Sequence, residues 1–374
     1  MNILQTTLNS RGDWHDLNGS LEPSSASLVF AFAAREVLEA HGSYQQLSKR
    51  FSSAKIVMLS TAGSFTDTQI APEDQIVCTA LKFEKATFET ASETLSSPED
   101  LMDCCERLVT LLSTEGLRHV LVFSDGSIVN GSTLAETLCQ KLPKGVTLSG
   151  GLAGDGTLFV RTVVGLDAPP SPGTIVAVGL YGESLHLGFG CSGGWQPFGP
   201  KRIVTRSSGN VLAELDGKSA LGIYKTYLGP EANALPASAL RFPLHVTPSG
   251  KSTSVVRTIL SIDETDGTMT FAGDIPEGAT IQFMKASYED LVSGAEEAAT
   301  EAGAADLLLC VSCVGRRIVL GQRVEDELEC VRAIAGPKST ITGFYSYGEL
   351  SPTSADGYCL LHNQTMTITS LSES

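Results

Sequence analysis

The segment RHVLVFSDGSIVNGSTLAETLCQKLPKGVTLSGGLAGDG, residues 118–156, contains one complete strand–helix–strand unit. An apolar run of β type ends at the first Asp-Gly, and a second apolar run ends in glycines. Between them, Leu134, Leu138 and Leu142 recur at helical spacing and would share one face of a helix. Ser132 or Thr133 can cap that helix at its N-terminus, and Glu136 then completes a capping box with Thr133.

The same pattern occurs about three times in the 374 residues, with further copies at residues 28–63 and 305–350. A helix between two strands of one sheet requires a right-handed crossover, so each copy predicts a parallel strand pair. The intervening stretches alternate as antiparallel strands do. We therefore expect an α/β (mixed α+β) protein whose mixed β-sheets, flanked by helices, are built from repeated strand–helix–strand units. Two domains are predicted, residues 24–215 and 216–371.

The bulk composition indicates a globular protein, with 42% apolar and 18% charged residues. A net charge of −16 argues against nucleic acid and anionic membrane surfaces as partners. No secretory signal is evident. The nine cysteines lie in apolar runs, as reduced core thiols of a cytoplasmic protein do.

The segment GFGCSGGWQPFGP, residues 188–200, matches both the dinucleotide fingerprint and the hydrolase nucleophile elbow. Both motifs require a helix to start at the glycines, and the prolines that follow prevent it. In GKS, residues 217–219, the Walker pattern fails because position 212 is leucine; Ser219 is expected to cap a helix instead. Cys310 and Cys313 lie on a predicted strand, where residues three apart face opposite sides, so we expect no metal or redox pair.

Polar residues and glycines concentrate at the ends of the predicted strands. Ligands of open α/β sheets bind beyond the carboxyl ends of strands, and arginine can anchor a carboxylate there. The candidate ligand-binding residues are Ser60, Thr61, Gly150, Gly151, Cys313, Arg316, Arg317, Tyr345 and Tyr347. Alternatively, the glycines only form turns.

These segments resemble the FIST family of sensory domains, from about Ser24 to Leu371. The junction of the family's two halves is matched closely by residues 194–224, GWQPFGPKRIVTRSSGNVLAELDGKSALGIY. Further matches are MLSTAG (58–63), LVFSDG (121–126), LSGGLAGDG (148–156), SCVGRR (312–317), GFYSYGEL (343–350) and LLHNQTMTI (360–368). In this family GWQPFGP is a structural turn between the domains, fixed by Trp195 and two prolines.

The resemblance implies a cytoplasmic sensor of a small molecule that acts on a separate signalling protein, since the chain shows no kinase, cyclase or receptor segment. A stand-alone NosP-like subset binds haem, senses nitric oxide and regulates a histidine kinase in trans. For such a haem, His186 and His362 are the candidate axial ligands, followed by His245 and Cys313. Covalent attachment is excluded because no C-x-x-C-H occurs.

Two alternatives remain. The ligand can be an amino-acid-like metabolite, with Arg316 or Arg317 as its carboxylate anchor. The protein can also be an enzyme, but no paired carboxylates, metal-ligand spacing or activated nucleophile support this, so we expect no catalytic site.

Overall fold

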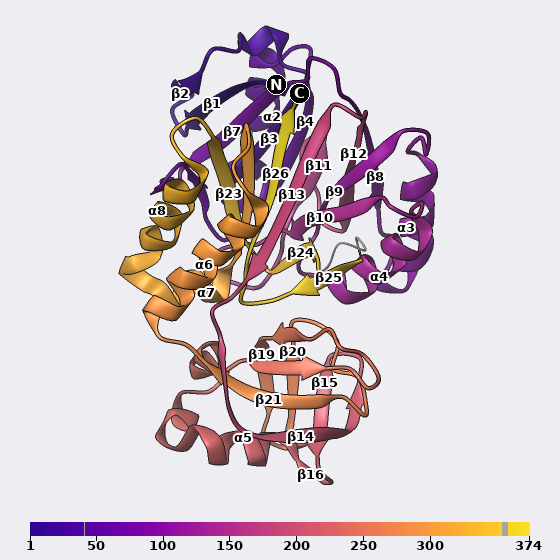
Figure 1. The fold of residues 1–374 in the computed structure, drawn as a ribbon, viewed down its shortest axis with the longest axis vertical. Coiled ribbons are helices and arrows are strands. Elements are labelled where there is room, and N and C mark those ends of the chain that lie inside the picture. The colour runs from indigo at the N-terminus through magenta and orange to yellow at the C-terminus, as the bar shows by residue number, and fades with distance from the viewer. Residues whose placement is uncertain (41, 354–357) are drawn as a thin grey trace.

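The structure is a computed structural model that describes residues 1–40, 42–353 and 358–374. Its strands form three six-stranded sheets and one eight-stranded sheet. Figure 1 shows two bodies, with both chain termini together at the far end of the larger one. We call residues 196–285, which contain the eight-stranded sheet, the small body. The remaining described residues form the three-sheet body.

The three predicted repeats are confirmed, because each contributes a parallel strand pair to its own six-stranded sheet. The pairs are β3 (Leu28–Ala33) with β4 (Lys55–Ser60), β9 (Leu117–Ser124) with β10 (Thr147–Leu152), and β22 (Leu307–Cys313) with β23 (Thr340–Ser346). The connecting helices are α1 (Arg35–Glu39) and α2 (Ser43–Arg50), α4 (Gly131–Lys141), and α7 (Val314–Leu320) and α8 (Val324–Ala335).

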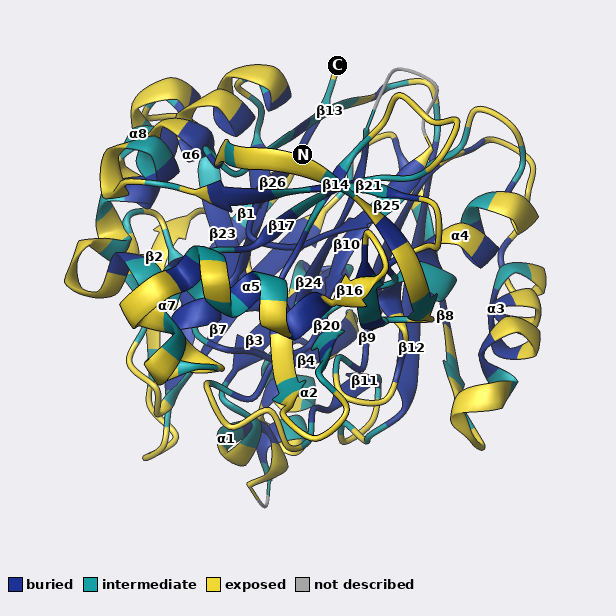
Figure 2. Ribbon diagram, turned by 90° about the horizontal axis from the view of Figure 1, so that it is seen from below, coloured by how far each residue is buried: buried dark blue, intermediate teal, exposed yellow. Residues whose placement is uncertain are grey.

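Each parallel pair is extended on one side by two antiparallel strands. These are β7 (Gln75–Lys82) and β1 (Asn2–Asn9), β12 (Thr174–Tyr181) and β8 (Thr87–Thr94), and β26 (Met366–Glu373) and β13 (Leu185–Ser192). The strand β2 (Trp14–Gly19) adds to β1. Helices α3 (Leu101–Thr110) and α6 (Tyr288–Ala302) cover outer faces of the sheets. In Figure 2 the helices are buried on their inner faces and exposed on their outer ones, as amphipathic helices are.

The three sheets are linked by exchange of short strands, because each repeat sends the segment after its second parallel strand to a neighbouring sheet. The exchanged strands are β5 (Ser64–Thr66) with β6 (Gln69–Ile70), β11 (Val164–Leu166), and β24 (Gly348–Pro352) with β25 (Cys359–His362). Three equivalent backbone hydrogen bonds close the ring: Ala62 N to Tyr345 O at 2.8 Å, Gly154 N to Ser60 O at 2.9 Å, and Tyr347 N to Leu152 O at 3.3 Å. The body is therefore a threefold pseudosymmetric assembly.

A shared apolar core fills the space between the three sheets. At its centre Phe32, Phe123 and Phe344 each come from a different sheet, with ring centroids 4.8 to 6.3 Å apart. Such a cluster is favourable because it buries large aromatic surfaces in tilted, offset contact. It holds the three sheets together independently of their order in the chain.

The small body is a mostly antiparallel sheet packed on one helix, α5 (Ala220–Leu228). Its strands are β14 (Gln196–Ser208), β15 (Val211–Leu215), β16 (Lys218–Ser219), β17 (Leu244–Thr247), β18 (Val255–Arg257), β19 (Ile259–Asp263), β20 (Thr268–Phe271) and β21 (Thr280–Lys285). Residues beyond 285 return to the three-sheet body, and two of its sheets combine strands from both sides of position 216. The predicted boundary at 215/216 thus does not separate independent sheets.

The predictions for the two helix caps and for the segment after Gly194 have different outcomes. Ser219 caps α5, as predicted, by accepting from Gly222 N at 3.2 Å. The predicted cap of α4 is wrong: Asn130 caps it, because its side chain accepts from Ser132 N and Thr133 N. Strand β14, not a helix, follows the glycines at 193–194, which confirms the rejection of both motifs there.

The turn at GWQPFGP is shorter than expected. Pro197 and Pro200 lie inside β14, so the prolines do not form the turn. Trp195 is buried and fixes it by donating Nε1–H to Gln364 O at 2.8 Å. Gly194 has φ +73° and contacts the backbone of Asp290, so a side chain would collide there.

Candidate functional site

Two cavities lie between the small body and the three-sheet body. The larger, about 990 Å³, is bounded by the ends of β9, β10 and β22 and by the small-body segments 234–240 and 258–260. We call it the uncharged cavity, because none of the described residues that line it is Asp, Glu, Lys, Arg or His. The histidine cavity, about 890 Å³, is lined by His245, His362, Trp195 and Met284 together with several hydroxyl side chains.

Of the predicted strand-end residues, Cys313 and Tyr347 line the uncharged cavity. Burial raises the pKa of the Cys313 thiol above its ordinary value, so the thiol stays protonated and neutral. Tyr347 donates its hydroxyl to Asp155 and stacks its ring on Phe159 at 4.6 Å between centroids. The two residues offer the cavity a thiol and an aromatic face, and no charge.

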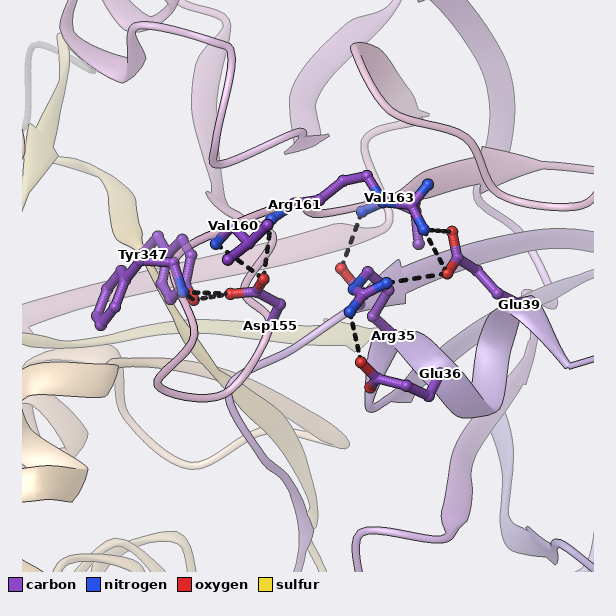
Figure 3. A network of polar contacts seen from close by, with 10 residues as sticks. Arg35, Glu36, Glu39, Asp155, Val160, Arg161, Val163 and Tyr347 are labelled. Atoms are coloured by element: carbon purple, nitrogen blue, oxygen red, sulfur yellow. Dashed lines mark hydrogen bonds and ion pairs between the residues drawn. The ribbon is translucent and has the colours of Figure 1, made fainter.

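Asp155 organises the loop that carries Phe159, and Figure 3 shows the contacts of its carboxylate with Tyr347 and with the backbone at Val160. Its carboxylate accepts backbone N–H groups from Phe159, Val160 and Arg161 at 2.9 to 3.0 Å. Arg161 in turn pairs with Glu39 of α1 at 2.7 Å. The loop at the cavity is therefore tied to two of the three repeats.

Gly150 and Gly151 are enclosed by protein and line neither cavity. A side chain on Gly150 would meet the backbone of Val122, and one on Gly151 would meet Val311. Both glycines allow the strands to pack closely, and both lie away from the two cavities.

Ser60 and Thr61 are also fully buried, and neither lines a cavity. Ser60 Oγ accepts from Val163 N at 2.9 Å, and Thr61 Oγ1 contacts Ala33 O and Gly63 N at 3.3 Å. Their hydroxyls stabilise the crossover between repeats and are not available to a ligand.

The predicted anchor Arg316 is a structural residue with no exposed side-chain surface. Each of its three nitrogens already donates: Nε and Nη2 to Glu327 at 3.1 and 2.8 Å, Nη2 also to Leu291 O, and Nη1 to Gly193 O. Tyr345 donates its hydroxyl to the same Glu327 at 2.8 Å. Arg316 and Tyr345 thus belong to a closed network of hydrogen bonds, and neither residue lines a cavity.

Arg317 is half-buried and lines neither cavity. It donates Nη1–H to Ala62 O, and its guanidinium lies 5.7 Å from the centre of the Tyr345 ring. Arg317 joins two repeats of the ring, so the structure provides no carboxylate anchor at the strand ends among the residues predicted for that role.

The two candidate haem ligands lie in different surroundings. His186 is exposed on β13 and contacts Ser374 Oγ at 2.6 Å, outside both cavities, so no apolar pocket surrounds it. His362 is buried and lines the histidine cavity. Burial lowers its pKa to about 4, so its imidazole is neutral at physiological pH. Its Nε2 lies 3.3 Å from Ser351 O, which can only accept, so Nε2 carries the proton.

Sequence reasoning missed the small-body side of the uncharged cavity, including Thr258. This residue is buried at the cavity wall, and its Oγ1 has no hydrogen-bond partner within the described chain. Its backbone N–H donates to Asn363 Oδ1 at 3.4 Å, which places an amide beside it. A threonine in a β-run carries no sequence signal for this role, because threonine is an ordinary strand residue.

Within the described residues, no helix is long and apolar enough to cross a bilayer.

Similarity to known proteins was found along most of the chain. Residues 27–218 match the FIST N domain and residues 220–352 match the FIST C domain. An uncharacterized protein of Mycobacterium tuberculosis, MT0656, is 28% identical over 258 residues, and the match spans 66% of each chain. A shorter match, to the Mycobacterium bovis protein Mb0898c, is 28% identical over 174 residues, 43% of this chain and 45% of that one.

Among solved structures, a cyanuric acid hydrolase from A. caulinodans aligns over 94% of this chain and 92% of its own, at a TM-score of 0.34 and 9% identity. Similarity at that level establishes neither a shared fold nor a shared activity. The two family models, in contrast, follow one another over nearly the whole segment in which the junction motif and strand-end motifs lie. The chain therefore belongs to the FIST family of sensory, signal-transduction domains.

Proposed function

We propose that this chain is a cytoplasmic sensor that binds a small molecule in the uncharged cavity and passes the signal to a separate protein, without transforming the ligand. The observation that carries the proposal is that both bodies line one cavity of about 990 Å³, a size typical of small-molecule sites. A ligand that contacts both bodies favours whichever relative position gives it the most contacts, and this is the requirement for a signal.

The proposal is tested by blocking the cavity. Ala237 lines it from an exposed segment of the small body, so Ala237→Trp should fill space while leaving the fold intact. In a thermal-shift screen against metabolites, amino acids included, a ligand of the folded protein raises Tm. We expect the shift to be absent in Ala237→Trp and retained in the control Ala333→Trp, on the exposed face of α8. A shift retained in both variants would place the ligand elsewhere.

A second candidate is a haem sensor of nitric oxide that regulates a histidine kinase in trans. It is favoured by the histidine cavity, where His362 presents a neutral imidazole whose Nε2–H faces a carbonyl, the arrangement typical of metal-ligating histidines. His245 lines the same cavity and its pKa is also lowered by burial, so it would be neutral as well. Phe189, Trp195 and Met284 supply apolar surface. A haem in this cavity would be held by His362, beside a wall that also carries Glu301 and several hydroxyl groups, and its iron would bind the gas.

This candidate is tested by adding haem to the purified protein. The expected result is a stoichiometric Soret band that shifts with nitric oxide, is lost in His362→Ala and is retained in the control His186→Ala. A spectrum of free haem in the wild-type protein, or an unchanged band in His362→Ala, would exclude the assignment. A pull-down of a histidine kinase that depends on nitric oxide would support the proposed partner.

A further inference from the structure

We infer that the ligand of the uncharged cavity is a neutral, largely apolar molecule. The inference rests on the proposed function, since it names the ligand class of the same site.

The first argument is the charge of the wall. The chain carries a net charge of −16, with 26 basic and 42 acidic residues, yet no described residue that lines this cavity has an ionisable side chain other than Cys313 and Tyr347. Burial raises the pKa of both groups above the ordinary value, so both are neutral. An ion that enters an apolar site loses its hydration, and here it would find no opposite charge. The cavity therefore selects against charged ligands.

The second argument is the apolar surface around the cavity. Of the thirteen exposed large apolar side chains in the described residues, five line it. They are Ile128, Phe159, Val160, Leu260 and Ile318, with Val160 73% exposed. A concentration of exposed apolar side chains marks a binding surface, since isolated ones would be spread over the molecule. Because they come from both bodies, an apolar ligand would bury surface on each.

The third argument is that the polar groups of the wall are neutral. Ser127, Asn130, Thr157, Asn210 and Asn363 line the cavity with hydroxyl and amide side chains. Such groups can hydrogen-bond an alcohol, ketone or amide without a charge on the ligand.

The ligand class is tested with a fluorescent dye and three eight-carbon competitors that differ in charge. N-phenyl-1-naphthylamine, a neutral dye that fluoresces in apolar sites, reports occupancy, and octan-1-ol, octanoate and octylammonium compete with it at neutral pH. We expect octan-1-ol to displace the dye at roughly a tenfold lower concentration than either ion. Displacement by an ion at the same or a lower concentration would overturn the inference, as would failure of dye and octan-1-ol to bind at all.

These outcomes separate the inference from the proposed function. If octan-1-ol binds Ala237→Trp as well as it binds wild type and Ala333→Trp, the cavity itself is the wrong site. If a charged metabolite from the thermal-shift screen binds wild type but not Ala237→Trp, the cavity is right and the ligand class is wrong.

Discussion

Two regions of the molecule each contain a buried arginine, and the two side chains are satisfied in different ways. In the three-sheet body, Arg316 forms an ion pair with Glu327, which is equally inaccessible to solvent. Between the bodies, Arg257 is 5% exposed and donates to neutral acceptors: Leu361 O at 2.9 Å, Asp274 O and Val256 O at 3.2 Å, and Ser132 Oγ at 3.4 Å. In the described chain, no carboxylate lies within ion-pair distance of it.

The difference indicates which region can move. A paired, fully hydrogen-bonded charge fixes its surroundings, because removal of either partner leaves an unpaired buried charge. Neutral acceptors hold Arg257 less strongly, and burial lowers its pKa to about 10. Two of its acceptors, Leu361 O and Ser132 Oγ, belong to the other body. We therefore expect the interface beside the uncharged cavity to adjust more readily than the three-sheet body.

The largest expected effect is on the paired arginine. Glu327→Ala removes the counter-charge of Arg316 and should lower the free energy of unfolding by about 3–5 kcal/mol. Urea denaturation measures this, with Glu329→Ala as the control on the exposed face of the same helix, where we expect a change within about 0.5 kcal/mol. Similar losses in both variants would mean that the network does not fix the body.

Glu349 lies between the two regions and gives the next largest effect. Burial raises its pKa to about 8, although Ser346, Thr365 and Arg316 act in the opposite direction. The carboxyl is therefore neutral when folded at mildly acidic pH and resists ionisation. Its contribution to stability is complete below the unfolded value near 4.5 and is lost as pH rises to about 8.

Between pH 6.5 and 8 the free energy of unfolding should thus fall by about 2 kcal/mol because of Glu349. The measurement compares wild type with Glu349→Gln, which should lack this slope. His119 and His362, whose pKa values burial lowers to about 3 and about 4, contribute stability above 6.5 that is lost at more acidic pH. Parallel curves for wild type and Glu349→Gln above pH 6.5 would contradict a raised pKa for Glu349.

A smaller effect is expected at the interface itself. Arg257→Met removes the donors to Leu361 O and Ser132 Oγ, but it also removes an unpaired charge, so the loss should be about 1–2 kcal/mol. Hydrogen exchange should increase at residues 258–260 and 361–363. The control Arg206→Met breaks an exposed pair with Glu214 and should change stability little. A loss as large as that of Glu327→Ala would remove the distinction between the two regions.

The repeats could be predicted from the sequence, while the assembly of the sheets could not. Each strand–helix–strand unit is local, so the apolar periodicity of its strands and helix reveals it. The exchanged strands β5 and β11 have three residues each, too few for a pattern. The partner of β5, β23, lies more than 270 residues away in the chain.

Only some residues of the uncharged cavity could be predicted, again because local patterns are visible in the sequence and long-range contacts are not. Cys313 is the last residue of β22 and Tyr347 follows β23, two strands whose carboxyl ends could be located, and both residues line the uncharged cavity. The ion pair of Arg316 could not be predicted, because the sequence does not show that Glu327 lies within reach one helix later. Thr258 was missed because its lack of a partner depends on how the small body packs against Asn363.

The smallest effect concerns two buried threonines that differ as the two arginines do. Thr79 Oγ1 is paired with Thr342 Oγ1 at 2.8 Å inside the three-sheet body, whereas Thr258 Oγ1 has no partner among the described residues. Thr79→Val leaves the Thr342 hydroxyl without its partner, so it should lower the free energy of unfolding by about 1 kcal/mol. Thr258→Val removes a buried hydroxyl that has no partner, so it should raise the free energy of unfolding by about 1 kcal/mol. Denaturation of the ligand-free proteins measures both changes. Destabilisation of Thr258→Val equal to that of Thr79→Val would show that the Thr258 hydroxyl is already satisfied in the folded protein.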